Sequence, residues 1–305
     1  MIYDVCHLTT YTYDSPVALA RCALRLLPKD EPGQIVLAAG LDISPAPVTS
    51  VERRDFFGNR VVNLTIETAH RELRVEARSR VEVGRIDASP PRRSEPWEDV
   101  NAAVLKSQAL AAQAPAHFIY SSRLVPLLDP VTDYARESFT DGGEIIESAT
   151  DLMHRIRADF LYDPKATAVS TPLLEAFENR GGVCQDFAHI MIAGLRGLGL
   201  PAAYVSGYIR SVPAAGKPLL EGADASHAWV SLWCGSHHGW IGLDPTNGMK
   251  VADEHVVLAV GRDYDDISPI HGILLGPGEQ EIDVAVHVIP WNGDRADDLP
   301  AAARA

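Results

Sequence analysis

Residues 181–200 read GGVCQDFAHIMIAGLRGLGL, and this stretch decides how the second half of the chain is expected to fold. Gly181-Gly182 interrupts the chain, and an apolar stripe at helical spacing follows it. The members of the stripe are Phe187, Ile190, Met191, Leu195 and Leu198. Gly199 and the following Leu200-Pro201 then provide a stop signal. The pattern predicts a helix whose first turn contains Cys184.

The first turn of a helix gives Cys184 a chemical opportunity. Unpaired backbone N–H groups and the helix macrodipole favour negative charge at this end, so a thiolate is stabilised there. The same N–H groups can hold a tetrahedral oxyanion. A lone cysteine at such a position is more often a buried and inert core residue, so the functional interpretation depends on partners elsewhere in the chain.

The partners are found in residues 226–248, which read SHAWVSLWCGSHHGWIGLDPTNG. Strand alternation places His227 and Trp229 on the same face as Asp244. With Gly235-Ser236 as a two-residue hairpin turn, Trp229 pairs with Gly242 and His227 lies directly opposite Asp244. Opposed Cβ atoms lie about 4.5–5.5 Å apart, within reach of a hydrogen bond between the two side chains. A bulge would shift this register by one residue.

Each of the three residues has an ordinary alternative when taken alone. His227 could be a core or surface histidine, and Asp244 a turn residue, because Asp-Pro starts turns. Taken together, Cys184, His227 and Asp244 supply a nucleophile, a base and a group that orients the base. The combination predicts a catalytic triad.

Three blocks of sequence carry a resemblance to a known family. Residues 182–189, 226–230 and 240–246 resemble the transglutaminase-like superfamily, within the broad papain-like group of cysteine enzymes. Residues 3–28 are similar to the β-domain that precedes the catalytic core in bacterial members, so the resemblance spans about residues 3–290. It implies that Cys184 is the nucleophile, His227 the base and Asp244 the orienting acid.

The resemblance implies attack on an amide carbonyl and a thioester acyl-enzyme. We expect hydrolysis of a peptide or related amide, as by a cysteine peptidase or amidase, because water needs no dedicated acceptor site. The alternatives are a protein-glutamine transglutaminase and a non-catalytic module that binds a peptide or protein on the same fold. Trp229 and Gln185 are candidates for the substrate cleft, although for Trp229 ordinary core filling is an equal alternative.

Several classes of cofactor and partner are disfavoured. No loop resembles an EF-hand, so calcium is not expected, and no other cofactor is expected. His237 and His238, with Cys234 and His255, could suggest a metal site, but His237 and His238 are adjacent on a predicted strand and point to opposite faces, so no metal site is predicted. The net charge of −14 argues against a nucleic-acid partner. The expected partner is a peptide or protein substrate, and the sequence leaves the oligomeric state open.

The termini and apolar runs bear on location. The first residues, MIYDVCHLTTYTYD, lack the basic and apolar regions of a signal peptide, and no apolar run approaches 18 residues. The four cysteines form no CxxC pair and no disulfide framework. We therefore expect a cytoplasmic protein with free thiols and no membrane association.

The chain divides by pattern into an α+β arrangement. Alternating Tyr, Val and Thr residues predict an antiparallel β-domain over 1–87. Three prolines between residues 89 and 96 predict a linker over 88–100. A papain-like or transglutaminase-like catalytic domain, with helices followed by an antiparallel sheet, is expected over 101–290, and a frayed tail over 291–305.

Overall fold

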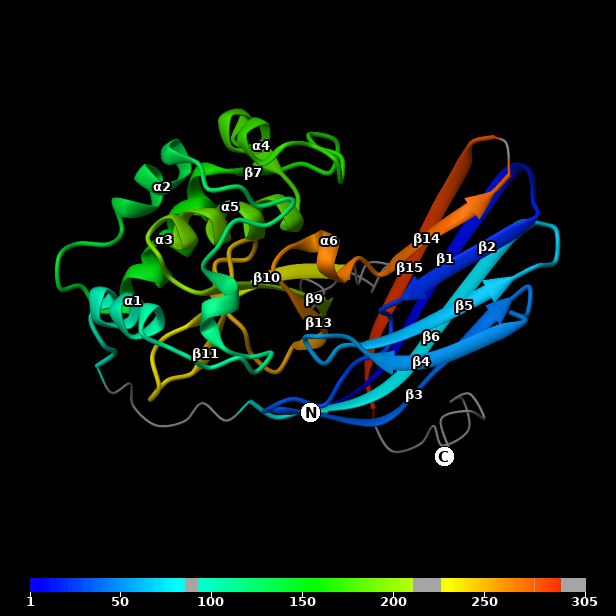
Figure 1. The fold of residues 1–305 in the computed structure, drawn as a ribbon, viewed down its shortest axis with the longest axis horizontal. Helices are drawn as coiled ribbons and strands as arrows, with labels where there is room; N and C mark the ends of the chain where they lie inside the picture. The colour runs from blue at the N-terminus through cyan, green and yellow to red at the C-terminus, as the bar shows by residue number, and fades with distance from the viewer. Residues whose placement is uncertain (86–92, 211–225, 277, 292–305) are drawn as a thin grey trace, which may run out of the picture.

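The computed structural model describes residues 1–85, 93–210, 226–276 and 278–291. These residues form a helical core built on a five-stranded sheet, beside a sandwich of two four-stranded sheets (Figure 1). The predicted α+β class is confirmed. Among the described residues, no helix is both long and apolar enough to cross a membrane.

The core contains the helices and the sheet that the sequence predicts for the second half. Its helices are α1 (Trp97–Leu105), α2 (Asp129–Arg136), α3 (Ile145–Asp159), α4 (Leu173–Asn179), α5 (Cys184–Gly197) and α6 (Tyr264–Ile267), with a short 3-10 turn at Pro115–Phe118. Its sheet has the order β12-β11-β10-β9-β13. These strands are β9 (Ala202–Ile209), β10 (Ser226–Trp233), β11 (Trp240–Asp244), β12 (Met249–Lys250) and β13 (His255–Gly261), all antiparallel.

Helix α5 lies at the centre of this core. Every residue from Asp186 to Arg196 is buried, because β9 and β10 cover one side and α2 and α4 pack against the helix as well. Two glycines allow close packing against α2. A Cβ at Gly194 would lie 2.6 Å from the Cβ of Ala135, and one at Gly197 would lie 2.0 Å from the Thr132 hydroxyl oxygen. A helix enclosed on all sides is a rigid support for a reactive residue at its start.

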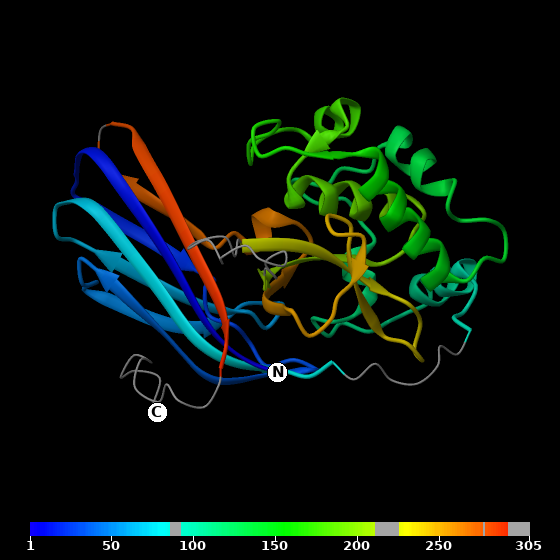
Figure 2. The same cartoon turned by 180° about the vertical axis from the view of Figure 1, so that it is seen from behind.

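The sandwich combines strands from both ends of the chain. One sheet has the order β15-β1-β6-β3 and the other β14-β2-β5-β4. The strands are β1 (Ile2–Val17), β2 (Leu19–Leu24), β3 (Gln34–Ser44), β4 (Thr49–Arg54), β5 (Arg60–Ile66), β6 (His70–Val83), β14 (Ile270–Leu275) and β15 (Gln280–Pro290). In Figures 1 and 2, β14 and β15 lie at the edge of the sandwich nearest the core.

The predicted domain boundaries need correction for this reason. We assigned residues up to 290 to the catalytic domain, but β14 pairs with β2 and β15 pairs with β1 along its length. The β-domain therefore extends beyond 1–87 and includes about 20 C-terminal residues. The predicted linker over 88–100 ends earlier than expected, since helix α1 begins at Trp97. Residues 86–92 of that linker and 292–305 of the predicted tail lie outside the described residues.

Side-chain amides of the sandwich complete the free edge of the core sheet. The amide of Gln34 donates to the Val257 carbonyl at 2.8 Å and accepts from the Val257 N–H at 2.8 Å. Asn59 makes the same pair of bonds to Val260, at 2.8 and 2.9 Å. Each amide therefore replaces a neighbouring strand along β13. An unpaired edge strand invites pairing with other chains, and here the sandwich satisfies it.

Candidate active site

Helix α5 begins with a network that fixes Cys184. The buried carboxylate of Asp186 accepts hydrogen bonds from the Val183 N–H at 2.8 Å and from the Thr167 hydroxyl at 2.6 Å. A Cβ at Gly182 would lie 2.4 Å from that carboxylate, so the glycine is required sterically. Cys184 is the first helical residue and is half-buried. Its first-turn position is as predicted, and the N–H groups of that turn have no acceptor within the helix.

The hairpin between β10 and β11 has a longer turn than predicted. The observed pairs include Val230 with Leu243 and Trp233 with Trp240, a shift of two residues from the predicted register. The Cys234 N–H donates to the Gly239 carbonyl at 2.8 Å, which closes a wider loop than the predicted Gly235-Ser236 turn. The predicted register was wrong. Because side chains alternate with a period of two, a two-residue shift leaves His227 and Asp244 on the same face.

A hydrogen bond of 2.8 Å joins His227 Nε2 to Asp244 Oδ2. The carboxylate of Asp244 is fully buried and heavily hydrogen-bonded. Its Oδ1 accepts from the N–H groups of Thr246 and Asn247 at 3.0 and 3.2 Å, and its Oδ2 also accepts from the Asn247 side-chain amide at 2.6 Å. Burial alone would raise the pKa of Asp244, but these bonds outweigh it and hold the pKa well below its ordinary value. Asp244 is therefore ionised.

The imidazole of His227 connects Asp244 to Cys184. Its Nε2 is engaged by Asp244, which leaves Nδ1 for the hydrogen bond to the Cys184 thiol. Burial would lower the pKa of His227, but the bonds to Asp244 and Cys184 outweigh it and raise the pKa to about 9. The ring is therefore charged at neutral pH. This arrangement suits an imidazolium paired with a thiolate, the reactive form of a cysteine nucleophile.

His255, at the start of β13, is a fourth member of the network that the sequence did not reveal. Its side chain is fully buried, and its Nδ1 accepts the Ala252 N–H at 3.3 Å. The ring proton is therefore on Nε2, which donates to Asp244 Oδ2 at 3.4 Å. Arg85, from the sandwich side, donates to the carbonyls of Ala252 and His255 at 3.0 and 2.6 Å. No motif marks His255, because only the pairing of β13 with β9 brings it here.

Among the described residues, the same side chains also have the spacing of a set of metal ligands. The ligand atoms of His227, Asp244 and His255 lie within 4.8 Å of one another, and all three residues are buried. Two hydrogen bonds to one carboxylate oxygen account for this spacing. A cation would have to displace the ring protons that make those bonds. His237 and His238, considered earlier as ligands, are not part of the grouping.

The two candidate cleft residues differ in their surroundings. Trp229 is 1% exposed and packs with Val205 and Val257, so its assignment to a cleft wall was wrong. A Cβ at Gly207 would lie 2.4 Å from the Trp229 ring, and this glycine makes the packing possible. Trp229 is core filling that supports the ring of His255, 5.2 Å away between ring centroids. Gln185 is partly buried beside Cys184 and donates to the Val169 carbonyl at 3.3 Å, and its role in a cleft stays a prediction.

His189, five residues past Cys184, is also buried but is differently bonded. Its Nε2 accepts the Tyr264 N–H at 3.3 Å, and its ring centroid lies 4.9 Å from that of Tyr204. Burial lowers the pKa of His189 to about 4. It is therefore a neutral packing residue.

Two family models match the chain. The model described as the bacterial transglutaminase-like N-terminal region matches residues 3–82, and that of the transglutaminase-like superfamily matches residues 132–245. The second match contains Cys184, His227 and Asp244. The first covers most of the sandwich strands contributed by the N-terminal part of the chain.

Similar proteins include some that match over nearly their whole length and one that matches over a short part. An uncharacterised protein of Mycobacterium tuberculosis is 36% identical over 304 residues, which cover 96% of this chain and 94% of the relative. A protein-glutamine gamma-glutamyltransferase of Pseudomonas aeruginosa is 34% identical over 105 residues, or 32% of this chain and 15% of that protein. The crystal structure of a candidate cysteine protease from Cytophaga hutchinsonii aligns with a TM-score of 0.71 at 20% identity, covering 96% and 92% of the two chains, and shows the same fold.

Proposed function

This chain belongs to the transglutaminase-like superfamily, and from that premise we propose that it is an enzyme whose Cys184 attacks amide bonds of peptides or proteins. The observation that carries the proposal is the 2.8 Å hydrogen bond between His227 and the buried Asp244, with Cys184 close enough to raise the pKa of the same imidazole. A binding module on the same fold would have no need for an ionised carboxylate, a charged imidazole and a half-exposed thiol in one line.

The first step of the proposed reaction forms a thioester. The Cys184 thiolate attacks the amide carbonyl carbon, and the electron pair of the C=O bond moves to oxygen. When the tetrahedral intermediate collapses, the C–N bond breaks and the His227 imidazolium protonates the leaving amine. The acyl group is then bonded to Cys184 and the imidazole is neutral.

Backbone amides are placed to stabilise the oxyanion of that intermediate. The N–H of Cys184 belongs to the first turn of α5, where the helix supplies no acceptor. The positive end of the helix dipole adds to the attraction. Donors that are fixed before the reaction cost no reorganisation during it, and Asp186 fixes this turn.

The second step decides the reaction class. Neutral His227 can remove a proton from water, and attack on the thioester then gives a carboxylic acid and regenerates the thiol. We propose this hydrolysis as the main reaction, because it needs no second binding site. Transfer to an amine is the second candidate, and the similarity to the Pseudomonas aeruginosa gamma-glutamyltransferase supports it.

The pH dependence of Cys184 alkylation tests the triad without a known substrate. Iodoacetamide labelling is followed by peptide mass spectrometry, with buried Cys22 and Cys234 as internal controls. We expect Cys184 to react well below the ordinary thiol pKa of about 8.5 and to lose this reactivity in His227→Ala. A Cys184 that reacts like an ordinary thiol, unchanged by His227→Ala, contradicts the proposal.

A second assay separates hydrolysis from transfer. An unfolded protein substrate is incubated with the enzyme in the presence of a fluorescent primary amine. Hydrolysis of peptide bonds produces new N-termini and no protein-bound fluorescence, whereas transfer produces fluorescent protein and releases ammonia. Cys184→Ser is the matched control for either outcome.

A further inference from the structure

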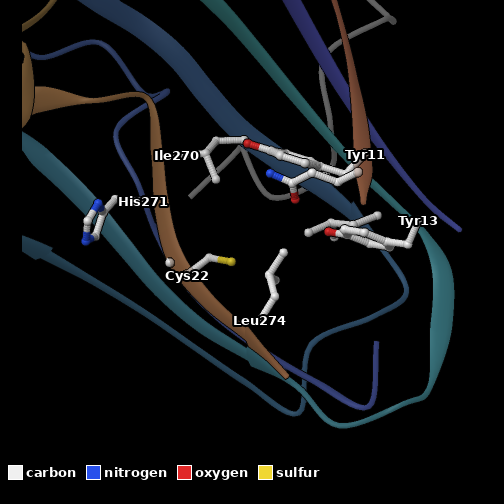
Figure 3. Close-up of a pocket in the computed structure, with 9 residues that line it drawn as sticks. Tyr11, Tyr13, Cys22, Ile270, His271 and Leu274 are labelled. Carbon is white, nitrogen blue, oxygen red and sulfur yellow. The ribbon is translucent and has the colours of Figure 1, made fainter. Parts of the chain in front are cut away.

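The edge of the sandwich nearest the core holds a cavity of about 250 Å³ (Figure 3). It lies between β1 and β14, with β15 at its rim. Tyr11, Tyr13, Cys22, Ile270, Leu274 and Gln280 are among the residues that line it. The catalytic steps described above use none of these residues.

The lining of the cavity combines aromatic and aliphatic side chains with polar groups, and it includes one unused donor. The rings of Tyr11 and Tyr13 are stacked, with centroids 6.4 Å apart and planes 15° from parallel. Tyr13 is 5% exposed, and its buried hydroxyl has no hydrogen-bond partner among the described residues. Figure 3 shows this hydroxyl directed towards Cys22 and Leu274. Buried polar groups normally have a partner, so the cavity is suited to a group that brings an acceptor to the Tyr13 hydroxyl.

The size of the cavity and its surroundings favour a side chain over a free small molecule. Sites for small molecules usually measure about 300–1,000 Å³, and this cavity is smaller. Apolar surface also continues outside it. Ile282, which pairs with Tyr11, is 50% exposed, and Val284 is 48% exposed on the same face of β15. A chain that placed one side chain in the cavity could continue across this surface.

The cavity is connected to the active site through α6. The Tyr264 N–H donates to His189, which lies about 7.5 Å along α5 from Cys184 at 1.5 Å per residue. The six residues from Tyr264 to Ile270 span at most about 20 Å. Cys184 and the cavity are therefore within about 30 Å of each other, a distance that an extended peptide of fewer than ten residues covers.

We propose that this cavity anchors an apolar side chain of the peptide or protein substrate while Cys184 attacks an amide elsewhere in the same chain. The Tyr13 hydroxyl donates to a carbonyl next to the anchored side chain. The inference rests on the proposed function, because it assigns a substrate contact to that reaction. It gives the β-sandwich a direct part in substrate selection.

Peptides that alkylate Cys184 test the anchor. Chloroacetyl or chloromethyl ketone groups are attached through two to eight glycines to Phe, or to Ala as the reference, with Phe on either side of the reactive group. We expect Phe to increase the rate of Cys184 labelling at least tenfold over Ala, at one range of spacer lengths. The ratio of the two rates is the readout, because it cancels any change in the reactivity of the thiol itself.

Matched variants locate the effect. Leu274→Trp fills the cavity, and we expect it to remove the advantage of Phe. Ile273→Trp adds the same ring to the neighbouring residue, which is 70% exposed and outside the cavity, and we expect the advantage to persist. Tyr13→Phe keeps the aromatic ring but removes the donor, and we expect it to reduce the advantage about threefold.

The possible outcomes separate this inference from the proposed function. If iodoacetamide labels Cys184 at low pH but Phe confers no advantage at any spacer length, the anchor is overturned and the reaction stands. An advantage that survives Leu274→Trp also overturns the anchor. If Cys184 is not activated in the unmodified protein, the proposed function is overturned, and the anchor with it.

Discussion

Two buried histidines in the same core show what distinguishes the active site from its support. His227, near the ends of β10 and β11, is 8% exposed, and His189, between α5 and α6, is 5% exposed. Burial by itself lowers the pKa of a histidine, and in His189 it lowers the pKa to about 4. In His227 the interactions with Asp244 and Cys184 outweigh burial, and the pKa is raised to about 9.

The two pKa values differ because the histidines have different partners, although both side chains are similarly buried. His227 faces a buried carboxylate at hydrogen-bond distance, and the Cys184 thiol also raises its pKa. His189 faces a backbone N–H, which needs a neutral ring nitrogen as its acceptor, and the aromatic ring of Tyr204. A histidine five residues from the nucleophile is therefore a packing residue, and one 43 residues away is the base. Substitutions along each network can test this comparison.

Removal of the base should have the largest effect. We expect His227→Ala to lower turnover about 10²–10⁴-fold, the usual contribution of a positioned acid–base group. The low-pH alkylation of Cys184 should disappear at the same time, because the thiolate loses its charged partner. His189→Gln is the control, and its labelling profile should match that of the unmodified protein. Equal effects of His227→Ala and His189→Gln would show that the two histidines do not differ in role.

Replacement of the orienting carboxylate should have the next largest effect. Asp244→Asn keeps the size of the side chain but removes its charge, so the pKa of His227 should fall from about 9 towards 6.5. Each unit is a factor of ten in the imidazolium equilibrium, and we expect labelling of Cys184 near neutral pH to slow roughly tenfold to a hundredfold. NMR titration of the imidazole provides the measurement. A His227 pKa that stays near 9 would show that Asp244 does not set it.

A smaller effect is expected at His255. His255→Phe keeps a ring against Trp229 but removes one of the hydrogen bonds that stabilise the Asp244 anion. Because one such bond contributes about 1 kcal/mol, we expect labelling of Cys184 near neutral pH to slow by less than about tenfold, which is less than in Asp244→Asn. The matched variant is His255→Gln, whose amide can both donate to Asp244 and accept from Ala252, and it should restore the original rate. A general packing defect would slow labelling in the Phe and Gln variants alike.

Local periodicity predicted the parts of the site that depend on neighbouring residues. The stripe of α5 placed Cys184 in the first turn, and strand alternation placed His227 and Asp244 on one face. The exact register of β10 and β11 was missed, because it depends on a loop whose length the turn residues did not reveal. The prediction of the pair survived only because the error was an even number of residues.

The parts that failed depend on contacts between distant segments. Alternation assigned Trp229 to the face of His227, but it could not show that side chains of the neighbouring strands β9 and β13, Val205 and Val257, pack against the ring. Residues 101–290 were expected to end in strands of the catalytic sheet, but nothing local shows that the partner of β15 is β1, about 280 residues earlier in the chain. His255 was missed for the same reason, since its contact with Asp244 exists only through the pairing of the core sheet.

The comparison of the two histidines also predicts opposite slopes in stability against pH, and this is the prediction with the least effect on reactivity. The pKa of His227 is raised to about 9 in the folded state, so its contribution to the free energy of unfolding is complete below about pH 6.5 and is lost as the pH rises to 9. The pKa of His189 is lowered to about 4, so its contribution to the free energy of unfolding is complete above about pH 6.5 and is lost as the pH falls towards 4. His7, with a pKa also lowered to about 4 by burial, adds to the second slope. Urea unfolding from pH 4 to 9 should therefore give a maximum near pH 6.5. We expect His227→Ala to flatten the fall in the free energy of unfolding above pH 6.5, and His189→Gln to reduce its rise between pH 4 and 6.5. If either variant changed both limbs of the curve equally, the assignment of a charged ring to His227 and a neutral ring to His189 would be contradicted.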